Sequence, residues 1–299
     1  MRDYLEQLAR AGQLVEVDRT VDPRHELAAV TRALQQRDAR AVRFNSVRGS
    51  ELPVVTNIHT SRERFAALIG ATRPTFCQRW QSLLRELENE RAPATAAVQR
   101  PPDLVGGALS QLPLITYHAR DAAPYLTAAI MLVKDPETGV PNLSFHRSMF
   151  VSDDELRVRI GESHDLAAAY AKAEARDEPL DAALLIGVPP ALFVAASASI
   201  PREASELALA ALIAGQPVSV YPGDSIALDI PAATEVVIEG RILPGERRRE
   251  GPFGEFLGYY VPEGRNPVFA VTSVYWRPRA VFHSLLCGSA EDRVPLQML

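Results

Sequence analysis

Between positions 250 and 260 the chain reads Glu250-Gly251-Pro252-Phe253-Gly254-Glu255-Phe256-Leu257-Gly258-Tyr259-Tyr260. This stretch places two carboxylates on either side of a Gly-Pro-Phe-Gly turn. Its glycines permit tight or left-handed backbone conformations, and its proline fixes one φ angle. A loop of this kind can bring both acids to one point, which favours a functional site around which the fold is organised. The alternative is a surface turn with solvated acids, which is common in loops.

The length and composition are those of a globular protein with a substantial core. The 299 residues are 47% hydrophobic and 23% charged, and the net charge of −5 argues against a generally basic surface that binds nucleic acid. Two cysteines, Cys77 and Cys287, lack metal-ligand spacing and suit a reducing compartment. The N-terminus does not resemble a signal peptide, and no apolar run is long enough to cross a bilayer. We therefore expect a soluble cytoplasmic protein that binds neither nucleic acid nor membrane.

The first hundred residues alternate helical and extended patterns, which predicts an α/β region. Helices are expected at 3–11, 22–34, 61–69 and 75–89, and strands at 14–17, 41–44 and 53–56. Residues 91–103 are rich in Ala, Arg and Pro, which indicates a linker. The sequence thus predicts an N-terminal domain with its linker over residues 1–103.

Patterns typical of β structure dominate the remainder, residues 104–299. Residues 126–133 and 142–151 predict a hairpin around a glycine-containing turn, and helices are expected at 165–175 and 203–214. Further strands are expected at 182–188, 217–221, 235–242, 268–276 and 280–285. Many strands with few crossover helices predict an antiparallel, barrel-like sheet. The expected fold class is therefore α+β.

The second strand of the predicted hairpin contains the sequence Asn142-Leu143-Ser144-Phe145-His146-Arg147. In a regular strand alternate side chains share a face, so Asn142, Ser144 and His146 would point one way and Arg147 the other. If Asn142 and Arg147 serve one site, a cofactor must lie across the strand or the strand must be bulged. An edge strand with one solvated face explains the same pattern without any site.

Two further polar residues lie at the starts of predicted helices. His164 comes just before the helix at 165–175, where a cap or a surface residue is commoner than a ligand. Glu206 lies in the first turn of the helix at 203–214, where the helix dipole alone favours an acid. Together with Asn142 they form a mixed oxygen and nitrogen set, which suits a hard divalent ion such as Mn²⁺ or Mg²⁺.

Several ordered segments resemble the UbiD-type decarboxylases, a family that uses prenylated FMN. The segments are Asn142-x-Ser-x-x-Arg147, His164, Pro201-Arg-Glu-Ala-Ser-Glu206-Leu-Ala-Leu-Ala, Glu239-Gly-Arg-Ile-Leu-Pro-Gly-Glu246 and Glu250-Gly-Pro-Phe-Gly-Glu255-x-x-Gly-Tyr-Tyr260. The last is the most specific. The resemblance spans nearly the whole chain, since the opening helix and Asp22-Pro23 also look like the family's N-terminal region.

The resemblance implies roles for particular residues. Asn142, His164 and Glu206 would hold Mn²⁺ against the flavin phosphate, with K⁺ nearby. Arg147, Glu250 and Glu255 would form the catalytic network. The residues that would bind prenylated FMN are Asn142, Ser144, Phe145, Arg147, His164, Ser197 and Glu206. The implied fold is an N-terminal α/β region followed by a split β-barrel of the flavin-reductase type over residues 104–299, which would bind the flavin and the metal.

The implied reaction is the reversible, non-oxidative decarboxylation of an aromatic, heteroaromatic or α,β-unsaturated carboxylic acid. Loss of CO₂ from such an acid leaves an sp² carbanion, and the prenylated flavin, supplied by a flavin prenyltransferase, acts as the electron sink. Arg147 would bind the carboxylate and Glu255 would supply the proton that replaces CO₂. Glu250 would hold Arg147 and bias the proton of Glu255.

Members of this family continue into a C-terminal domain that mediates oligomerisation and closes over the cofactor, and we expect that domain to be absent from these 299 residues. Two alternative functions therefore stay open. One is a non-catalytic flavin-binding subunit that needs a separate C-terminal part. The other is an ordinary FMN oxidoreductase on a split barrel, in which the Arg-Glu-Glu set has no obvious use. With the C-terminal domain present, we expect a homodimer or a larger assembly.

Overall fold

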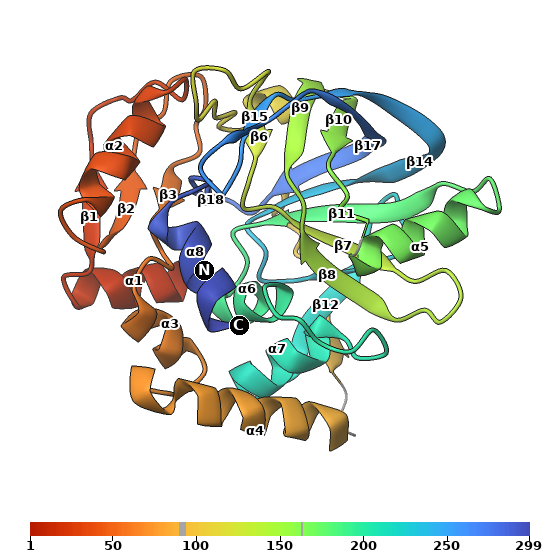
Figure 1. Ribbon diagram of the computed structural model, residues 1–299, viewed down its shortest axis with the longest axis horizontal. Helices are drawn as coiled ribbons and strands as arrows, with labels where there is room; N and C mark the ends of the chain where they lie inside the picture. Colours follow the sequence, from red (N-terminus) through yellow and green to blue (C-terminus); the bar gives the residue numbers. More distant parts are fainter. Residues whose placement is uncertain (90–93, 163) are drawn as a thin grey trace.

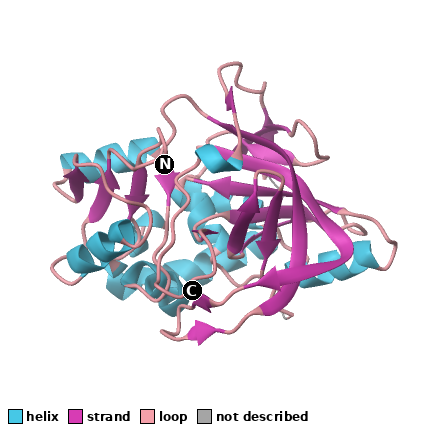
Figure 2. Ribbon diagram, turned by 90° about the horizontal axis from the view of Figure 1, so that it is seen from above, coloured by secondary structure: helices cyan, strands magenta, loops and turns pink. Residues whose placement is uncertain are grey.

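The computed structural model describes residues 1–89, 94–162 and 164–299. Its fold is mixed α/β, with a small N-terminal sheet and its helices on one side and a large sheet on the other (Figure 1). Figure 2 shows the long strands of the large sheet curving around one side of the molecule, while most helices gather towards the other.

The N-terminal region follows the order predicted from the sequence. Its elements are α1 (Arg2–Arg10), β1 (Leu14–Val17), α2 (Glu26–Gln35), β2 (Ala41–Phe44), β3 (Val54–Thr56), α3 (Arg62–Leu68), the 3₁₀ turn η1 (Arg73–Thr75) and α4 (Phe76–Asn89). One boundary was wrong, because α2 begins at Glu26 and not near residue 22. His25, just before α2, has a φ of 69°, which is incompatible with a right-handed helix and delays its start.

The four-stranded N-terminal sheet has the order β1-β2-β3-β18, and its last strand comes from the far end of the chain. β18 (Phe282–His283) pairs in parallel with β3. The sequence predicted a strand at 280–285 within the barrel-like sheet. That prediction was wrong in length and in partner, since pairing with β3 places the segment in the other sheet.

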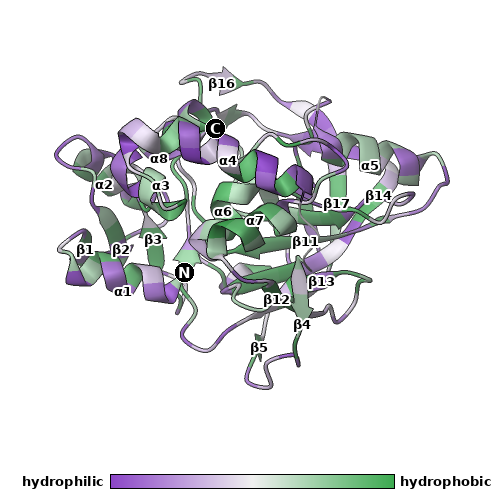
Figure 3. Ribbon diagram, turned by 90° about the horizontal axis from the view of Figure 1, so that it is seen from below, coloured by the Kyte–Doolittle hydropathy of each residue, from purple (hydrophilic) through white to green (hydrophobic). Residues whose placement is uncertain are grey.

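Helix α8 (Ala290–Met298) ties the end of the described chain to the N-terminal region. The fully buried Glu291 carboxylate accepts the backbone N–H groups of Asn57, Ile58 and His59 at 2.6, 2.7 and 3.2 Å, and His283 Nε2 lies 3.2 Å away. α8 also packs against α3 (Figures 1 and 3). These bonds join residues that are 232 to 234 positions apart in the sequence, and they hold α8 to the N-terminal region.

The large sheet has nine strands in the order β6-β9-β10-β17-β14-β11-β7-β8, with β5 paired to β17. These strands are β5 (Val105–Gly106), β6 (Tyr125–Leu126), β7 (Ile130–Lys134), β8 (Pro141–Phe145), β9 (Ser148–Ser152), β10 (Glu155–Val158), β11 (Leu180–Ile186), β14 (Val236–Glu250) and β17 (Gly264–Trp276). All their pairings are antiparallel, as predicted. β6 and β8 stand at the two ends of the order, so the described strands form an open sheet and not a closed barrel.

Strand β14 is far longer than the sequence predicted. It was expected to end at residue 242, but it continues to Glu250. A shift of register between Ile242 and Arg247 absorbs the irregular Leu-Pro-Gly segment without ending the pairing with β17. Glu250 is therefore the last residue of a strand and does not belong to a loop, which corrects the expectation from the sequence.

Three helices lie against the large sheet, namely α5 (Asp165–Glu174), α6 (Pro190–Ala196) and α7 (Glu206–Ala214). In Figure 3, α6 and α7 are coloured as predominantly hydrophobic, and α4 packs on α7. α7 begins at Glu206 and not at residue 203, because the Ser205 side chain accepts the N–H of Leu207 and caps the helix there.

The remaining short elements are η2 (Leu109–Gln111), a sheet of β13 (Asp229–Pro231), β12 (Val218–Pro222) and β4 (Thr95–Ala97), and the pair β15 (Phe253–Gly254) and β16 (Tyr260–Val261). β4 pairs in parallel with β12, so this part of the predicted linker is a strand. Residues 91–93 of that linker lie outside the described residues. Across the parts of the chain that the structure describes, no helix is both long and apolar enough to span a bilayer.

Candidate active site

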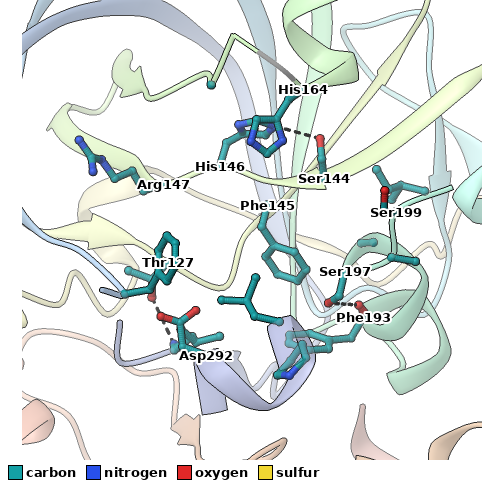
Figure 4. Close-up of a pocket in the computed structure, with 18 of the residues that line it drawn as sticks. Thr127, Ser144, Phe145, His146, Arg147, His164, Phe193, Ser197, Ser199 and Asp292 are labelled. Atoms are coloured by element: carbon teal, nitrogen blue, oxygen red, sulfur yellow. Dashed lines mark hydrogen bonds between the residues drawn. The ribbon is translucent and has the colours of Figure 1, made fainter. Parts of the chain in front are cut away.

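A pocket of about 640 Å³ opens beside the end of β8, between α6, α7 and α8. Figure 4 shows two groups of side chains around it, with Ser144, His146 and His164 towards one end and Thr127 and Asp292 towards another. We call the first, with Asn142 and Glu206, the Glu206 end. The second we call the Arg147 end, and its charged side chains are Arg147, Glu255 and Asp292.

Arg147 reaches this pocket because its strand stops early. The sequence predicted one strand at 142–151, but β8 ends at Phe145 and β9 begins only at Ser148. His146 and Arg147 form the connection between them. The interruption removes the conflict posed by strict alternation, and Asn142 and Arg147 line the same pocket.

Two carboxylates hold the Arg147 guanidinium. Its Nε and Nη2 donate to the two oxygens of Glu250 at 3.0 and 2.9 Å, and its Nη1 donates to Glu255. Burial opposes the charge of Arg147, but the hydrogen bonds and charge of Glu250 outweigh it and raise the pKa of the guanidinium. The guanidinium carbon also lies 5.0 Å from the ring centroid of Phe253. The stretch from 250 to 255 therefore does bring two acids to one point.

Glu250 is fully buried and accepts as many hydrogen bonds as its oxygens can take. The Tyr125 hydroxyl donates to Oε1 and Asn266 Nδ2 donates to Oε2, both at 2.9 Å. With the two bonds from Arg147, each oxygen accepts two, one for each lone pair. Burial and the neighbouring Glu250 charge raise the pKa of Tyr125, so this hydroxyl keeps its proton and remains a donor. A solvated surface turn does not describe this acid.

Glu255 differs from Glu250 in its surroundings. Its side chain is 21% exposed, whereas that of Glu250 is not exposed at all. It meets Arg147 through one oxygen, and among the described residues its other oxygen has a single long contact of 3.4 Å with the N–H of Phe256. Glu255 is therefore the carboxylate that can move and exchange with solvent or ligand.

At the Glu206 end a buried carboxylate meets neutral groups in the described part of the chain. Asn142 Nδ2 donates to Glu206 Oε1 at 3.1 Å, and the N–H of Leu143 donates to Oε2 at 3.0 Å. The exposed fraction of Glu206 is 4%, and burial raises its pKa to about 7. The dipole of α7 favours an acid at this position, but a surface helix start would not bury it.

Ser144 and His146 lie beside Asn142, as the alternation along the strand predicted. Ser144 Oγ donates to Asn142 Oδ1 at 3.0 Å and lies 2.9 Å from His146 Nε2 (Figure 4). The ring centroid of His164 lies 5.3 Å from that of His146. Gly161 makes room for this ring, because a Cβ at that position would lie 2.5 Å from His164 Cδ2. His164 thus precedes α5, as predicted, and also lines the pocket.

The donor atoms at the Glu206 end fit a divalent cation. An amide oxygen, an imidazole and a carboxylate line one pocket, and all three are ligand types that Mn²⁺ accepts. The raised pKa of Glu206 belongs to a buried acid that a positive charge would stabilise. Among the described residues, no group of three or more His, Cys, Asp and Glu side chains could hold a metal, so the candidate set depends on the amide of Asn142.

The other residues predicted to contact a cofactor are Phe145 and Ser197. The rings of Phe145 and Phe193 meet edge to face with centroids 5.0 Å apart, and Ser197 Oγ donates to the Phe193 carbonyl at 2.8 Å. They form an apolar wall with a hydroxyl at its edge. All seven predicted cofactor contacts line the pocket, and its volume suits a cofactor or another ligand of that size.

Several side chains that complete the site were not predicted from the sequence. Tyr125 and Asn266 come from β6 and β17, 125 and 16 residues from Glu250. Asp292 and Cys287 line the Arg147 end from α8 and the segment before it. Burial raises the pKa of Asp292 to about 6 and that of the Cys287 thiol well above its usual value. No local motif marks these four residues.

Two family models together match most of the chain. The N-terminal domain model of the 3-octaprenyl-4-hydroxybenzoate carboxy-lyases, UbiD, matches residues 5–84. The Rift-related domain model of the same carboxy-lyases matches residues 85–290.

Among curated proteins, the chain is similar to an anhydromevalonate phosphate decarboxylase of Methanothermobacter thermautotrophicus, with 31% identity over 98% of this chain and 67% of the relative. It is also similar to a phenolic acid decarboxylase of Streptomyces sp. (strain D7), with 31% identity over 96% of this chain and 64% of the relative. The chain thus spans about two thirds of the length of these relatives.

Solved structures agree over the whole described fold. An evolved dimeric form of the UbiD-class enzyme HmfF from Pelotomaculum thermopropionicum, in complex with prFMN, has a TM-score of 0.91 and 34% identity, covering 99% of this chain and 70% of that one. The vanillic acid decarboxylase of Sedimentibacter hydroxybenzoicus has a TM-score of 0.89 and 28% identity, covering 99% and 66%. From the matched family models and the shared fold, we conclude that this chain belongs to the UbiD carboxy-lyase family.

Proposed function

We propose that the protein catalyses the reversible, non-oxidative decarboxylation of an aromatic, heteroaromatic or α,β-unsaturated carboxylic acid with prenylated FMN. The observation that carries this proposal is the ion-pair network of Arg147 with Glu250 and Glu255 at one end of a cofactor-sized pocket. Membership of the UbiD family and the similarity to two decarboxylases support it.

Arg147 is the proposed binding group for the substrate carboxylate. A guanidinium has five N–H donors, and three of them serve Glu250 and Glu255. Two donors therefore remain for an incoming carboxylate, on a cation already fixed by Glu250. Because this orientation exists before binding, the substrate need not organise it.

Glu255 is the proposed proton donor. Glu250 accepts four hydrogen bonds in full burial, so protonating it would break at least one of them. Glu255 has no such restraint, and it is partly exposed. A carboxylic acid that exchanges its proton with solvent and faces the substrate can replace CO₂ with hydrogen. Glu250 then acts by holding Arg147 and by keeping a fixed negative charge nearby.

The cofactor is proposed to lie between the two ends of the pocket. Prenylated FMN supplies an electron sink for the charge left when the carbon–carboxylate bond breaks. Phe145 and Ser197 would line its binding surface, and Asn142, His164 and Glu206 would hold Mn²⁺ beside its phosphate, with K⁺ nearby. The large open sheet is the proposed counterpart of a flavin-binding split barrel. A flavin prenyltransferase is the proposed supplier, and a homodimer or larger assembly is the proposed state of the whole protein.

The test is coexpression with a flavin prenyltransferase in medium containing Mn²⁺, followed by intact-mass, metal and absorbance analysis. We expect bound prenylated FMN with stoichiometric Mn²⁺ and exchange of substrate hydrogen with D₂O across a panel of unsaturated and aromatic acids. Glu255→Gln should lose the exchange and keep the cofactor. Glu263→Gln is the matched control, since that acid is half-exposed and does not line the pocket. Protein that carries cofactor and metal but exchanges hydrogen with no acid would contradict the proposal.

A further inference from the structure

Asp292 presents an uncommitted carboxylate oxygen to the Arg147 end of the pocket. It is the third residue of α8, and its Oδ2 accepts the N–H of Gly288 at 2.9 Å. Within the described part of the chain, Oδ1 accepts no hydrogen bond, and the residue lines the cavity (Figure 4). One oxygen thus fixes the side chain, and the other is available to a ligand.

The wall around Asp292 is apolar or negatively charged. Pro295 and Leu296 follow three and four residues later on the same face of α8 and also line the pocket. Burial, and then the charge of Glu255, raise the pKa of Asp292 to about 6, so it is ionised at pH 8. Arg147, which lines the pocket, already serves Glu250 and Glu255. Arg293, the neighbour of Asp292 on α8, is exposed and outside the pocket lining, and it lowers the pKa of Asp292 less than burial and Glu255 raise it. A ligand in the pocket therefore meets an anionic acceptor at Asp292.

We propose that Asp292 determines substrate specificity by favouring acids that carry a neutral hydrogen-bond donor, such as a phenol hydroxyl or a ring N–H, and by rejecting acids with a second anionic group. This inference rests on the proposed function, because Arg147 must bind the reacting carboxylate of the substrate. The rest of the substrate then lies along the pocket wall that contains Asp292. A carboxylate accepts a hydrogen bond from a neutral donor more strongly than a neutral acceptor does. It repels a second carboxylate or a phosphate in the same enclosed space, where charge is poorly screened.

A structural role alone also explains an acid at this position. Asp292 lies in the first turn of α8, where a negative charge stabilises the helix, and its bond to Gly288 anchors the turn. Two substitutions separate the roles. Asp292→Asn removes the charge and keeps an oxygen that can accept the Gly288 N–H. Asp292→Ser also removes the charge, and its side chain is too short to place an acceptor in the pocket. Thermal unfolding of each variant shows whether the helix start is retained.

The experiment measures dissociation constants by calorimetry at pH 8, with protein loaded with ordinary FMN so that binding is observed without turnover. Two matched series of acids are compared: 4-hydroxybenzoate, benzoate and terephthalate, and 4-hydroxycinnamate, cinnamate and 4-carboxycinnamate. In the series that wild type binds more tightly, the hydroxy acid should bind about 10- to 100-fold more tightly than the unsubstituted acid. The diacid of that series should bind more weakly than either. Glu263→Gln, which removes one charge outside the pocket, should keep this order.

The variants distinguish a specificity role from a structural one. Asp292→Asn should bind the diacid about tenfold or more tightly than wild type does, and Asp292→Ser should also bring the hydroxy and unsubstituted acids to nearly equal affinity. Equal effects on all three acids, or a wild type that does not distinguish them, would overturn the inference while leaving the proposed function intact. Binding of no acid in either series would count against the proposed function, and the inference would fall with it.

Discussion

The two ends of the pocket treat buried charge in opposite ways. At the Arg147 end, Glu250 is fully buried and meets a guanidinium on both oxygens, and Tyr125 and Asn266 add one hydrogen bond each. At the Glu206 end, an almost equally buried carboxylate meets an amide and a backbone N–H in the described part of the chain, and burial raises its pKa to about 7. One charge is compensated by the protein. The other favours binding a proton or a cation.

This difference suggests different roles for the two buried carboxylates: Glu250 fixes the position of a protein side chain, and Glu206 can bind an ion from outside. A buried ion pair with all its hydrogen bonds made has a fixed geometry, which suits a group that must orient a substrate. A buried carboxylate with neutral partners has an unfavourable charged form, which suits a group that receives a metal ion. Variants at the two ends should therefore change the free energy of unfolding for different reasons.

Arg147→Met should be the most destabilising of these variants. It leaves the Glu250 carboxylate buried without its cation, which costs about 3–5 kcal/mol of unfolding free energy, and it should abolish decarboxylation. Denaturant unfolding and a turnover assay measure both effects. Adding Glu250→Gln to the variant removes the buried charge and should recover part of the stability but no activity. If the single variant had the same unfolding free energy as wild type, Arg147 would not be the group that compensates the buried charge of Glu250.

Glu206 should make the metal-free protein less stable as the pH rises. Its pKa is raised in the folded state, so the fold binds its proton more tightly than the unfolded chain does. Stability is therefore lost as the pH rises from about 4.5 to about 7, by at most about 3 kcal/mol. Unfolding with a chelator present, from pH 5 to pH 8, measures this loss.

Two comparisons isolate the contribution of Glu206 to that loss. Glu206→Gln cannot ionise, so its unfolding free energy should lack this part of the pH dependence. Mn²⁺ should restore the stability of wild type at pH 8 and have little effect on the variant. Parallel pH curves for the two metal-free proteins would show that the Glu206 charge is compensated after all, and the contrast between the ends would disappear.

Tyr125→Phe and Asn266→Ala should have intermediate effects. Each removes one of four hydrogen bonds to a buried carboxylate, which costs about 1–3 kcal/mol of unfolding free energy. Glu250 would also hold the Arg147 guanidinium less firmly, so the KM for the acid substrate should rise. A merely structural role predicts the loss of stability with an unchanged KM. Phe150→Leu, a partly buried change on β9 beside Tyr125, is a control for packing next to the site.

Glu255→Gln should have the smallest effect on stability and a large effect on activity. Its side chain is partly exposed, and its ion pair is one of several contacts of Arg147, so the unfolding free energy should change by about 1 kcal/mol or less. Decarboxylation should fall about 10²- to 10⁴-fold because the proton donor is lost. A large loss of stability would mean that Glu255 belongs to the fixed part of the Arg147 end.

Local signals in the sequence predicted most elements, whereas the family resemblance supplied the candidate residues Asn142, Arg147, His164, Glu206, Glu250 and Glu255. Periodicity marked the helices, and the Gly-Pro-Phe-Gly turn between Glu250 and Glu255 marked the point where two acids could meet. The alternation of Asn142, Ser144 and His146 was also correct. The end of that strand could not be predicted, because no residue after Phe145 is typical of a strand end. The break between β8 and β9 is what brings Arg147 into the pocket.

What could not be predicted depends on pairing between distant segments. The donors to Glu250 come from Tyr125 and Asn266, and a tyrosine or an asparagine in a strand has no pattern that names its partner. The start of α8 brings Asp292 to the cavity only because the segment before it joins the N-terminal sheet. The prediction of a barrel-like sheet was too coarse for a related reason, since the sequence pattern shows that there are many strands but not which sheet edges remain open.

The pairing of β18 with β3 sets the order in which the chain can fold as it leaves the ribosome. Until residues 282–291 have been synthesised, β3 lacks one neighbour, and the N–H groups of Asn57, Ile58 and His59 lack the Glu291 carboxylate. The N-terminal region emerges first, yet its sheet is completed only by residues 282–283, and such distant contacts form slowly. While residues 57–281 are being synthesised, the nascent chain therefore carries an open strand edge, to which a chaperone or a second nascent copy would attach.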